Sequence, residues 1–136
     1  MTETLRLEIV TPQGIAFAEE VEMVTLPASE EQLGVYPNHA PVITQIVPGE
    51  IIVLQQGRER FLAVGEGVVE ITARQVSIVT DMAIPAEKID EGRVEEARAR
   101  AAARLSEKIS DEEVASVNAS LARSLAQLQV RRRRRP

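Results

Sequence analysis

The sequence has no cysteine and a single histidine, His39, among its 136 residues. The absence of cysteine excludes disulfides, thiolate metal ligands and cysteine nucleophiles. One histidine cannot build a multi-histidine metal site. His39 stands in the stretch LGVYPNHAPVI (33–43), beside prolines and outside any nucleophile motif. We therefore interpret it as a structural residue of a turn or an interface, without a catalytic role.

Aromatic residues are also scarce, with two phenylalanines, one tyrosine and no tryptophan. Few ring faces are left for stacking bases or sugars, so nucleotide binding on an aromatic platform is not expected. The core must then consist of Val, Ile, Leu and Ala. No window approaches the roughly 18 uninterrupted apolar residues that a membrane-spanning helix needs. We therefore expect a soluble, cytoplasmic protein.

Charge is distributed unevenly along the chain. Residues 1–84 hold twelve acidic and four basic residues, a balance of −8, whereas residues 85–136 hold nine acidic and twelve basic residues, a balance of +3. Because the net charge is −5 and the run Arg131–Arg135 supplies +5, the rest of the chain carries −10 and would repel a nucleic acid. We expect a frayed tail that touches an acidic protein surface, with a solvated tail of no function as the alternative.

Short apolar runs with a period of two fill the chain from Leu5 to Thr80, which is typical of strands. Residues 51–54 and 61–64 predict one central hairpin. The glycine pair of residues 65–67 predicts a bulge or turn between strands rather than a phosphate loop, because no lysine and no helix follow it. The whole pattern predicts a β-sandwich or flattened barrel, since turn signals recur at residues 12–14, 48–49, 55–58, 65–67 and 72–75.

After Ile84 the pattern changes, because glycine and proline become rare and helix formers take over. Residues 87–105 predict one helix, and Ser110 with Glu113 forms a capping box at the start of a second helix. The faces that should meet are lined by Val94, Ala97, Ala101 and Leu105 on the first helix and by Val114, Val117, Leu121, Leu125 and Leu128 on the second. We thus predict a β domain over residues 1–84 and an antiparallel helical hairpin with a basic tail over residues 85–136.

This hairpin should need a further surface to be stable. Isolated helices of fewer than roughly 15 residues are marginal in water, and a narrow seam lined with alanine buries little apolar area. The sandwich, a partner protein, or each in turn can supply that surface. The last option is the physical basis of a switch.

Four segments carry a resemblance to a known family: LEIVTPQG (7–14), VEMVTLPASEEQLGVYPNHAPVI (21–43), FLAVGEGVVEI (61–71) and KIDEGRVEEARARA (88–101). Over essentially its whole length the sequence resembles the epsilon subunit of the rotary F-type ATP synthase. Asn38 replaces a glycine that the family carries before the histidine. Asparagine tolerates the left-handed backbone, so we expect the turn to persist.

The resemblance implies a non-catalytic subunit of the central stalk, the rotor of a proton- or sodium-translocating ATP synthase. Its sandwich would clamp the gamma subunit and rest on the c-ring. Its hairpin would fold down on the sandwich or extend along gamma into the catalytic alpha/beta head and inhibit ATP hydrolysis. The protein would then lie on the cytoplasmic face of the bacterial plasma membrane, touching the membrane only through the complex.

The resemblance also assigns contacts to individual residues. The loop that would face the c-ring, and the turn beside it, supply Ser29, Glu30, Glu31, Gln32, Leu33 and His39. The basic residues that would attract an acidic segment of the beta subunit are Arg98, Arg100, Arg104, Lys108, Arg123, Arg131, Arg132, Arg133, Arg134 and Arg135.

Some members of the family bind ATP on the folded-down hairpin through the motif I/L-D-x-x-R-A, which here reads IDEGRV (89–94). Asp90 and Arg93 match the motif, and Arg123 on the second helix would add a cation. Val94 replaces the alanine, and Ile84 stands where strong binders carry an acid. No cofactor is required, and the sequence leaves open whether ATP binds as a weak regulatory ligand.

A second reading, from another class, is a free-standing nucleic-acid adaptor that uses the arginine run. The charge balance opposes it, so we expect no nucleic acid among the partners. An enzyme is not expected, because the sequence offers no nucleophile motif and no set of metal ligands.

Overall fold

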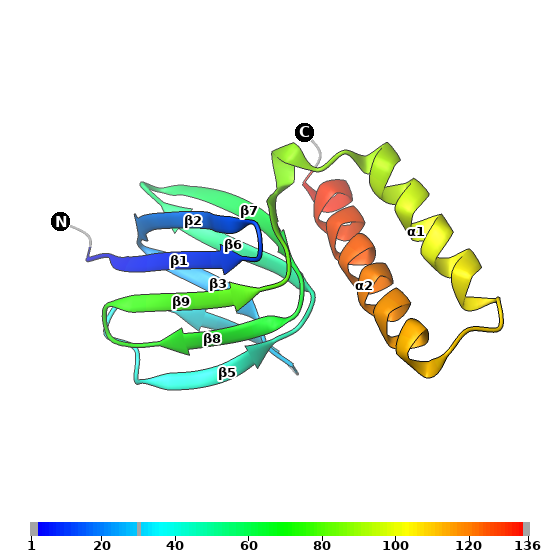
Figure 1. The fold of residues 1–136 in the computed structure, drawn as a ribbon. Helices are drawn as coiled ribbons and strands as arrows, with labels where there is room; N and C mark the ends of the chain where they lie inside the picture. The colour runs from blue at the N-terminus through cyan, green and yellow to red at the C-terminus, as the bar shows by residue number, and fades with distance from the viewer. Residues whose placement is uncertain (1–2, 30, 135–136) are drawn as a thin grey trace.

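The computed structural model describes residues 3–29 and 31–134, which form a two-sheet sandwich followed by two helices (Figure 1). This confirms the predicted fold class. The strands are β1 (Leu5–Thr11), β2 (Gly14–Val21), β3 (Met23–Pro27), β4 (Gln32–Val35), β5 (Val42–Ile46), β6 (Gly49–Gln55), β7 (Arg58–Val64), β8 (Gly67–Ile71), β9 (Gln75–Thr80) and β10 (Ala83–Pro85). A 3-10 turn η1 (Ala86–Lys88) leads to the helices α1 (Glu91–Leu105) and α2 (Asp111–Arg133).

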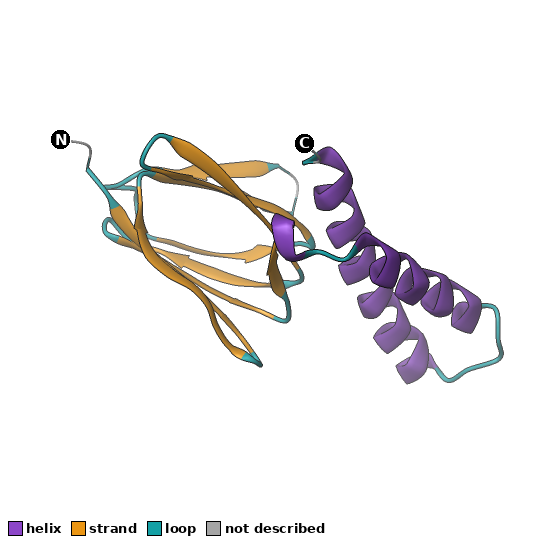
Figure 2. Cartoon of the chain, turned by 90° about the horizontal axis from the view of Figure 1, so that it is seen from above, coloured by secondary structure: helices purple, strands orange, loops and turns teal. Residues whose placement is uncertain are grey.

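The two sheets pack face to face over a core of aliphatic side chains and Phe17 (Figure 2). One sheet, here called sheet A, has the order β2-β1-β9-β8-β5, and sheet B has the order β10-β7-β6-β3-β4. Buried side chains alternate with exposed ones along several strands, as in β1, where Leu5, Leu7 and Ile9 are fully buried. The predicted central hairpin is β6–β7, and every predicted turn lies between two strands or at the start of one.

Local sequence accounts for most of the turns. Gln56 and Gly57 have positive φ at the tip of the β6–β7 hairpin, and Asn38, with a φ of 70°, adopts the left-handed conformation expected of it. Residues 65–66 form a turn between β7 and β8, and no helix follows, as predicted.

The helices begin at side-chain caps. The Asp90 carboxylate accepts a hydrogen bond from the Arg93 amide, so α1 begins later than residue 87. The Ser110 hydroxyl accepts a hydrogen bond from the Glu113 amide, which confirms the predicted cap of α2. No helix in the described part of the chain is both long and apolar enough to cross a membrane.

Helix α2 lies between α1 and the sandwich (Figure 1). Its neighbours on the sandwich side are β6, β7 and η1. Val130 of α2 joins a second apolar cluster with Ala63, Met82, Ala86 and Ile89. The hairpin is therefore folded down, and the sandwich is the further surface that it needs.

The apolar face predicted for α2 is wrong at one position. Leu125 is 50% exposed, whereas the buried residues of α2 are Ser124, Ala126, Leu128 and Val130. The heptad pattern assumes one partner, but α2 packs against α1 on one side and the sandwich on another. Small residues between the leucines are therefore buried in place of Leu125.

Candidate functional site

A cavity of about 360 Å³ lies between η1, the start of α1 and the middle of α2. Three cations and one carboxylate line it, together with apolar and small polar side chains. The lining residues are Ile84, Lys88, Asp90, Arg93, Val94, Ala97, Arg100, Ser124 and Gln127. Such an excess of positive charge beside an apolar wall fits a phosphorylated ligand.

The structure brings together two of the three residues expected for ATP. Asp90 and Arg93 both line the cavity, although Asp90 also caps α1. Arg123 does not line it. The Arg123 guanidinium donates to the Asp81 carboxylate at 3.1 Å and lines a neighbouring cavity of about 560 Å³ under the β1–β2 hairpin.

Sequence reasoning missed two cations of this cavity, Lys88 and Arg100. The signal for Arg100 was present, because Arg93, Ala97 and Arg100 are spaced by four and three residues and so share one face of α1. Lys88 lies in η1, whose fold could not be read from helical periodicity. Ile84 also lines the cavity and adds apolar surface to it.

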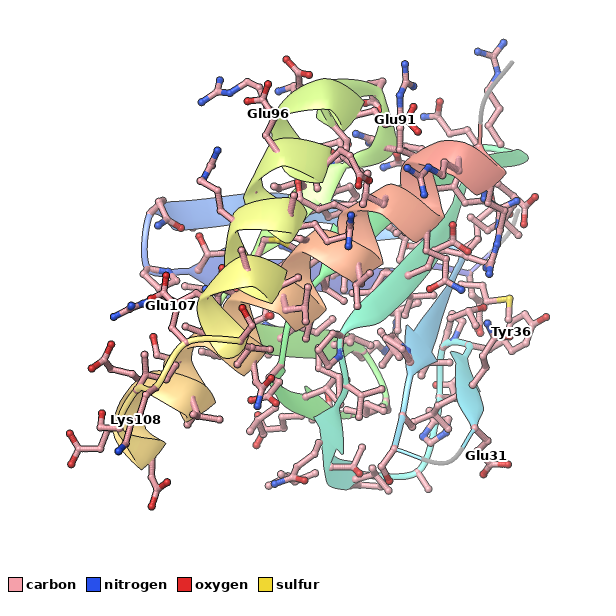
Figure 3. The ribbon with its side chains drawn as sticks, turned by 90° about the vertical axis from the view of Figure 1, so that its right-hand side faces the viewer. Glu31, Tyr36, Glu91, Glu96, Glu107 and Lys108 are labelled. Carbon is pink, nitrogen blue, oxygen red and sulfur yellow. The ribbon has the colours of Figure 1, made fainter. Side chains whose placement is uncertain are left out.

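The residues expected to face a ring fall into two separate places. Ser29 and Glu31 lie in the loop before β4, with Gln32 and Leu33 at the start of that strand, and Glu30 lies outside the described residues. His39 lies in the turn that follows the other end of β4, so this four-residue strand separates it from the loop along the chain. Figure 3 shows Glu31 and Tyr36 at the two ends of β4.

The His39 turn contacts sheet A. Its Nδ1 lies 2.7 Å from the Ala40 carbonyl oxygen, and the Asn38 amide donates to the Ala73 carbonyl. His39 therefore makes local polar contacts, consistent with a structural residue. In residues 3–29 and 31–134, no group of three acidic or histidine side chains is placed to hold a metal ion.

Most of the expected inhibitory cations are paired with carboxylates of this chain. Arg98 lies 2.6 Å from Glu95, and Arg104 pairs with Glu107 and Glu113. The hydrogen bond to Glu107 raises the pKa of Arg104 above its usual value. Among the described residues, Lys108, Arg100 and Arg131 make no ion pair, and Lys108 lies in the exposed link between the helices (Figure 3).

Arg131, Arg132 and Arg133 of the arginine run are helical rather than frayed, which corrects the sequence expectation. Helix α2 continues to Arg133, and Arg134 caps it by donating its amide to the Val130 carbonyl. Its acidic partners lie in the same chain: Glu91 and Glu95 for Arg132, and Glu50 for Arg133 and Arg134. Arg135 lies outside the described residues.

The outer face of sheet A carries a row of exposed apolar side chains across four adjacent strands. Val10 pairs with Ile15 and with Val79, and Val79 pairs with Val68. Ile15 is 71% exposed and Val79 is 63% exposed. We call these four residues the sheet A stripe. An aligned apolar row of this kind is typical of a surface covered by a partner.

Comparison with known proteins places both parts of the chain. The family model described as ATP synthase, Delta/Epsilon chain, beta-sandwich domain matches residues 4–86, and the model described as ATP synthase, Delta/Epsilon chain, long alpha-helix domain matches residues 87–131.

Two solved structures have a similar fold. A chain of the Euglena gracilis mitochondrial ATP synthase, in a structure of its OSCP/F1/c-ring, has a TM-score of 0.75 at 22% identity, covering 93% of this chain and 79% of that one. A chain of the Tetrahymena thermophila mitochondrial ATP synthase central stalk and c-ring has a TM-score of 0.59 at 10% identity, covering 96% of this chain and 98% of that one. At these identities the likeness concerns the fold alone.

Proposed function

The chain belongs to the ATP synthase delta/epsilon chain family, and from this premise we propose that it is a non-catalytic rotor subunit of the central stalk. The observation that carries the proposal is the match of both domains over residues 4–131. The partners would be the gamma subunit and the c-ring, and the protein would reach the membrane only through the complex. The coupling ion would be a proton or sodium.

The sheet A stripe supports the contact with gamma. Its side chains already lie in register on one face of sheet A, so covering them would remove apolar surface from water with little loss of conformational freedom. The alternative of a nucleic-acid adaptor is not proposed, because Arg132, Arg133 and Arg134 already pair with carboxylates of this chain.

A binding experiment tests this contact. Val79→Asp places a charge at the centre of the stripe and should weaken capture of the chain by an epsilon-free catalytic head about tenfold or more, the size of burying an unpaired charge. Asn118→Asp adds the same charge at an exposed position of α2 and should leave capture unchanged. Equal capture of the two variants would exclude the stripe, and failure of the unmutated chain to bind would exclude the rotor role.

We further propose that the helices restrain ATP hydrolysis when the hairpin leaves the sandwich. The support is the basic character of residues 85–136, with a balance of +3 against −8 in residues 1–84. The test measures the ATPase rate of the reconstituted head with the full chain and with a chain ending at Lys88. Equal rates would contradict the proposal.

For the cavity lined by Asp90 and Arg93 we propose a weak ATP site. Arg93 and Arg100 would meet phosphates. Replacing either by Gln should weaken ATP binding about three- to tenfold by calorimetry, since each removes one charged hydrogen-bond donor. Arg98→Gln is the matched control, because Arg98 lies on the same helix, pairs with Glu95 and does not line the cavity. Absence of ATP binding by the unmutated chain would contradict the site.

A further inference from the structure

The end of helix α2 is fastened to sheet B through one carboxylate, that of Glu50 in β6. The Glu50 side chain is only 5% exposed. Arg134 donates to both of its oxygens, from Nε at 2.9 Å and from Nη2 at 2.8 Å, and Arg133 donates to it from Nη1 at 3.2 Å. Hydrogen bonds between a guanidinium and a carboxylate are stronger than those between neutral groups, and the bidentate geometry of Arg134 also fixes the orientation of the two side chains.

An aromatic ring completes this contact. The Arg134 guanidinium carbon lies 3.9 Å from the centroid of the Phe61 ring on the neighbouring strand β7. The ring holds the planar guanidinium over its face and keeps water from one side of the ion pair. The contact therefore joins residues 83 and 84 positions apart in the chain.

A second contact ties the same helix end to α1. Arg132 donates from Nε to Glu91 at 2.7 Å and from Nη2 to Glu95 at 3.1 Å. Three consecutive arginines thus hold α2 to the sandwich and to the other helix at once. The apolar contact beside them is small, because Val130 alone of α2 joins the cluster with Ala63 and Met82.

We propose that Arg132, Arg133 and Arg134, with Glu50, Glu91 and Glu95, form an arginine latch that holds the hairpin on the sandwich and opens as ionic strength rises. The charges of the two domains are opposite, with −8 in residues 1–84 and +3 in residues 85–136, so salt weakens their attraction. The latched arginines are also unavailable to an acidic partner until α2 leaves sheet B. Docking on the sandwich and docking on such a partner are therefore mutually exclusive uses of the same three side chains.

The experiment uses the full chain with two spin labels. The sequence has no cysteine, so Arg74→Cys in the β8–β9 turn and Asn118→Cys on α2 give one labelled pair at exposed positions. The distance distribution gives the ratio of detached to docked hairpin. Between about 0.1 M and about 1 M salt, where the Debye length falls from about 10 Å to about 3 Å, the ratio should rise.

Arg134→Gln should raise the ratio about tenfold at the lower salt, the effect of losing a charged bidentate pair, and should flatten its salt dependence. Arg131→Gln is the matched control, since Arg131 makes no ion pair in the described structure, and should change the ratio less than about twofold. Combining Arg134→Gln with Glu50→Gln should add little to Glu50→Gln alone, because the loss of the Glu50 charge already breaks its pairs with Arg133 and Arg134. Equal effects of Arg131→Gln and Arg134→Gln, or a ratio independent of salt, would overturn the latch.

Two further measurements keep the test decisive. If Glu50→Gln does not fold, Phe61→Leu removes the ring beneath Arg134, retains an apolar side chain, and should also raise the ratio. If the docked state dominates in every variant, hydrogen exchange at the amides of Gln127–Val130 reports rare openings. Protection there should then fall about tenfold in Arg134→Gln and not in Arg131→Gln, and equal protection would overturn the latch.

Discussion

At the scale of single residues, two glycines at strand ends are fixed by close contacts. A Cβ on Gly67 would lie 2.2 Å from the Val79 carbonyl oxygen, and one on Gly65 would lie 1.8 Å from Asp81 Oδ1. The neighbour of Gly67 is backbone in β9 and cannot rotate away, whereas that of Gly65 is the end of a side chain. The two positions should therefore differ in their tolerance of alanine.

Gly67→Ala should lower the free energy of unfolding by about 1–3 kcal/mol, because β8 must shift away from β9 to accept the methyl group. Gly92→Ala is the opposite case. It lies in the first turn of α1, where the nearest atom to a new Cβ is 3.6 Å away, and should stabilise the helix by about 0.5 kcal/mol. Urea unfolding followed by circular dichroism checks both signs. A Gly67→Ala variant as stable as the unmutated chain would contradict the close contact at Gly67, and destabilisation by Gly92→Ala would contradict the open surroundings of Gly92.

Some contacts of this protein could be predicted from the residue types in the sequence, and others could not. The cap formed by Ser110 and Glu113 was predictable because the two residues are three positions apart. The left-handed backbone of Asn38 was predictable because the turn requires that conformation and asparagine tolerates it. The partners of the arginine run could not be read in this way. Glu50 is 84 positions from Arg134, and nothing in the local sequence distinguishes it from eleven other acidic residues in 1–84.

At the scale of elements, helix α2 packs against both α1 and the sandwich. This packing determines which of its leucines contributes to stability. Leu128 is 2% exposed and Leu125 is 50% exposed. Leu128→Ala should therefore lower the thermal midpoint of the helical signal markedly, at a cost of about 2–4 kcal/mol, whereas Leu125→Ala should change it by about 0.5 kcal/mol or less. Thermal circular dichroism at a helix-sensitive wavelength measures both. Equal effects of the two substitutions would instead support the heptad face predicted from the sequence, in which Leu125 and Leu128 are both buried.

The pairing of α1 with the end of α2 should depend on pH through Glu95. The hydrogen bond from Arg98 is the main cause that lowers its pKa below the ordinary 4.5, and Arg132 adds to it. The carboxylate thus binds its proton less readily in the folded hairpin than in the unfolded chain. Its stabilising contribution is complete above pH 4.5 and is lost as the pH falls through the lowered folded pKa.

Helicity measured by circular dichroism during an acid titration tests this. The unmutated chain should lose helical signal below about pH 4.5, and Glu95→Gln should lose less over that interval because the neutral side chain has no charge to give up. Glu96→Gln is the control, since Glu96 is exposed on the same helix (Figure 3). Identical titrations of all three proteins would show that Glu95 does not cause the loss of helicity at low pH.

At the scale of the whole molecule, the two parts depend on each other unequally. The main core takes all its buried members from strands β1 to β9, and no helical residue contributes to it. The helices share only the smaller cluster around Ala63 and Met82. The sequence predicted this division from the change of hydrophobic period, but not which sheet the helices cover, because that depends on partners distant in the chain.

A chain ending at Lys88 should therefore retain the β-sheet spectrum and dispersed amide resonances of the sandwich. A peptide of residues 87–136 should be largely unfolded in water, because its helices lose the surface they pack on. Circular dichroism and amide spectra of the two fragments measure this. A folded peptide, or an unfolded sandwich fragment, would contradict the unequal dependence.

The parallel pairing of β1 with β9 also bears on the order in which the protein is made. Leu7 is in register with Val76, so the first strand cannot take its place between β2 and β9 in sheet A until residue 76 and its neighbours have been synthesised. The β6–β7 and β3–β6 pairs of sheet B need no such wait. On the ribosome, strands β3, β4, β6 and β7 of sheet B can pair early, while β1 and β2 form a hairpin with an unpaired edge. Closure of the sandwich is therefore the late step of synthesis, and during that interval the nascent chain is most open to chaperones and to aggregation.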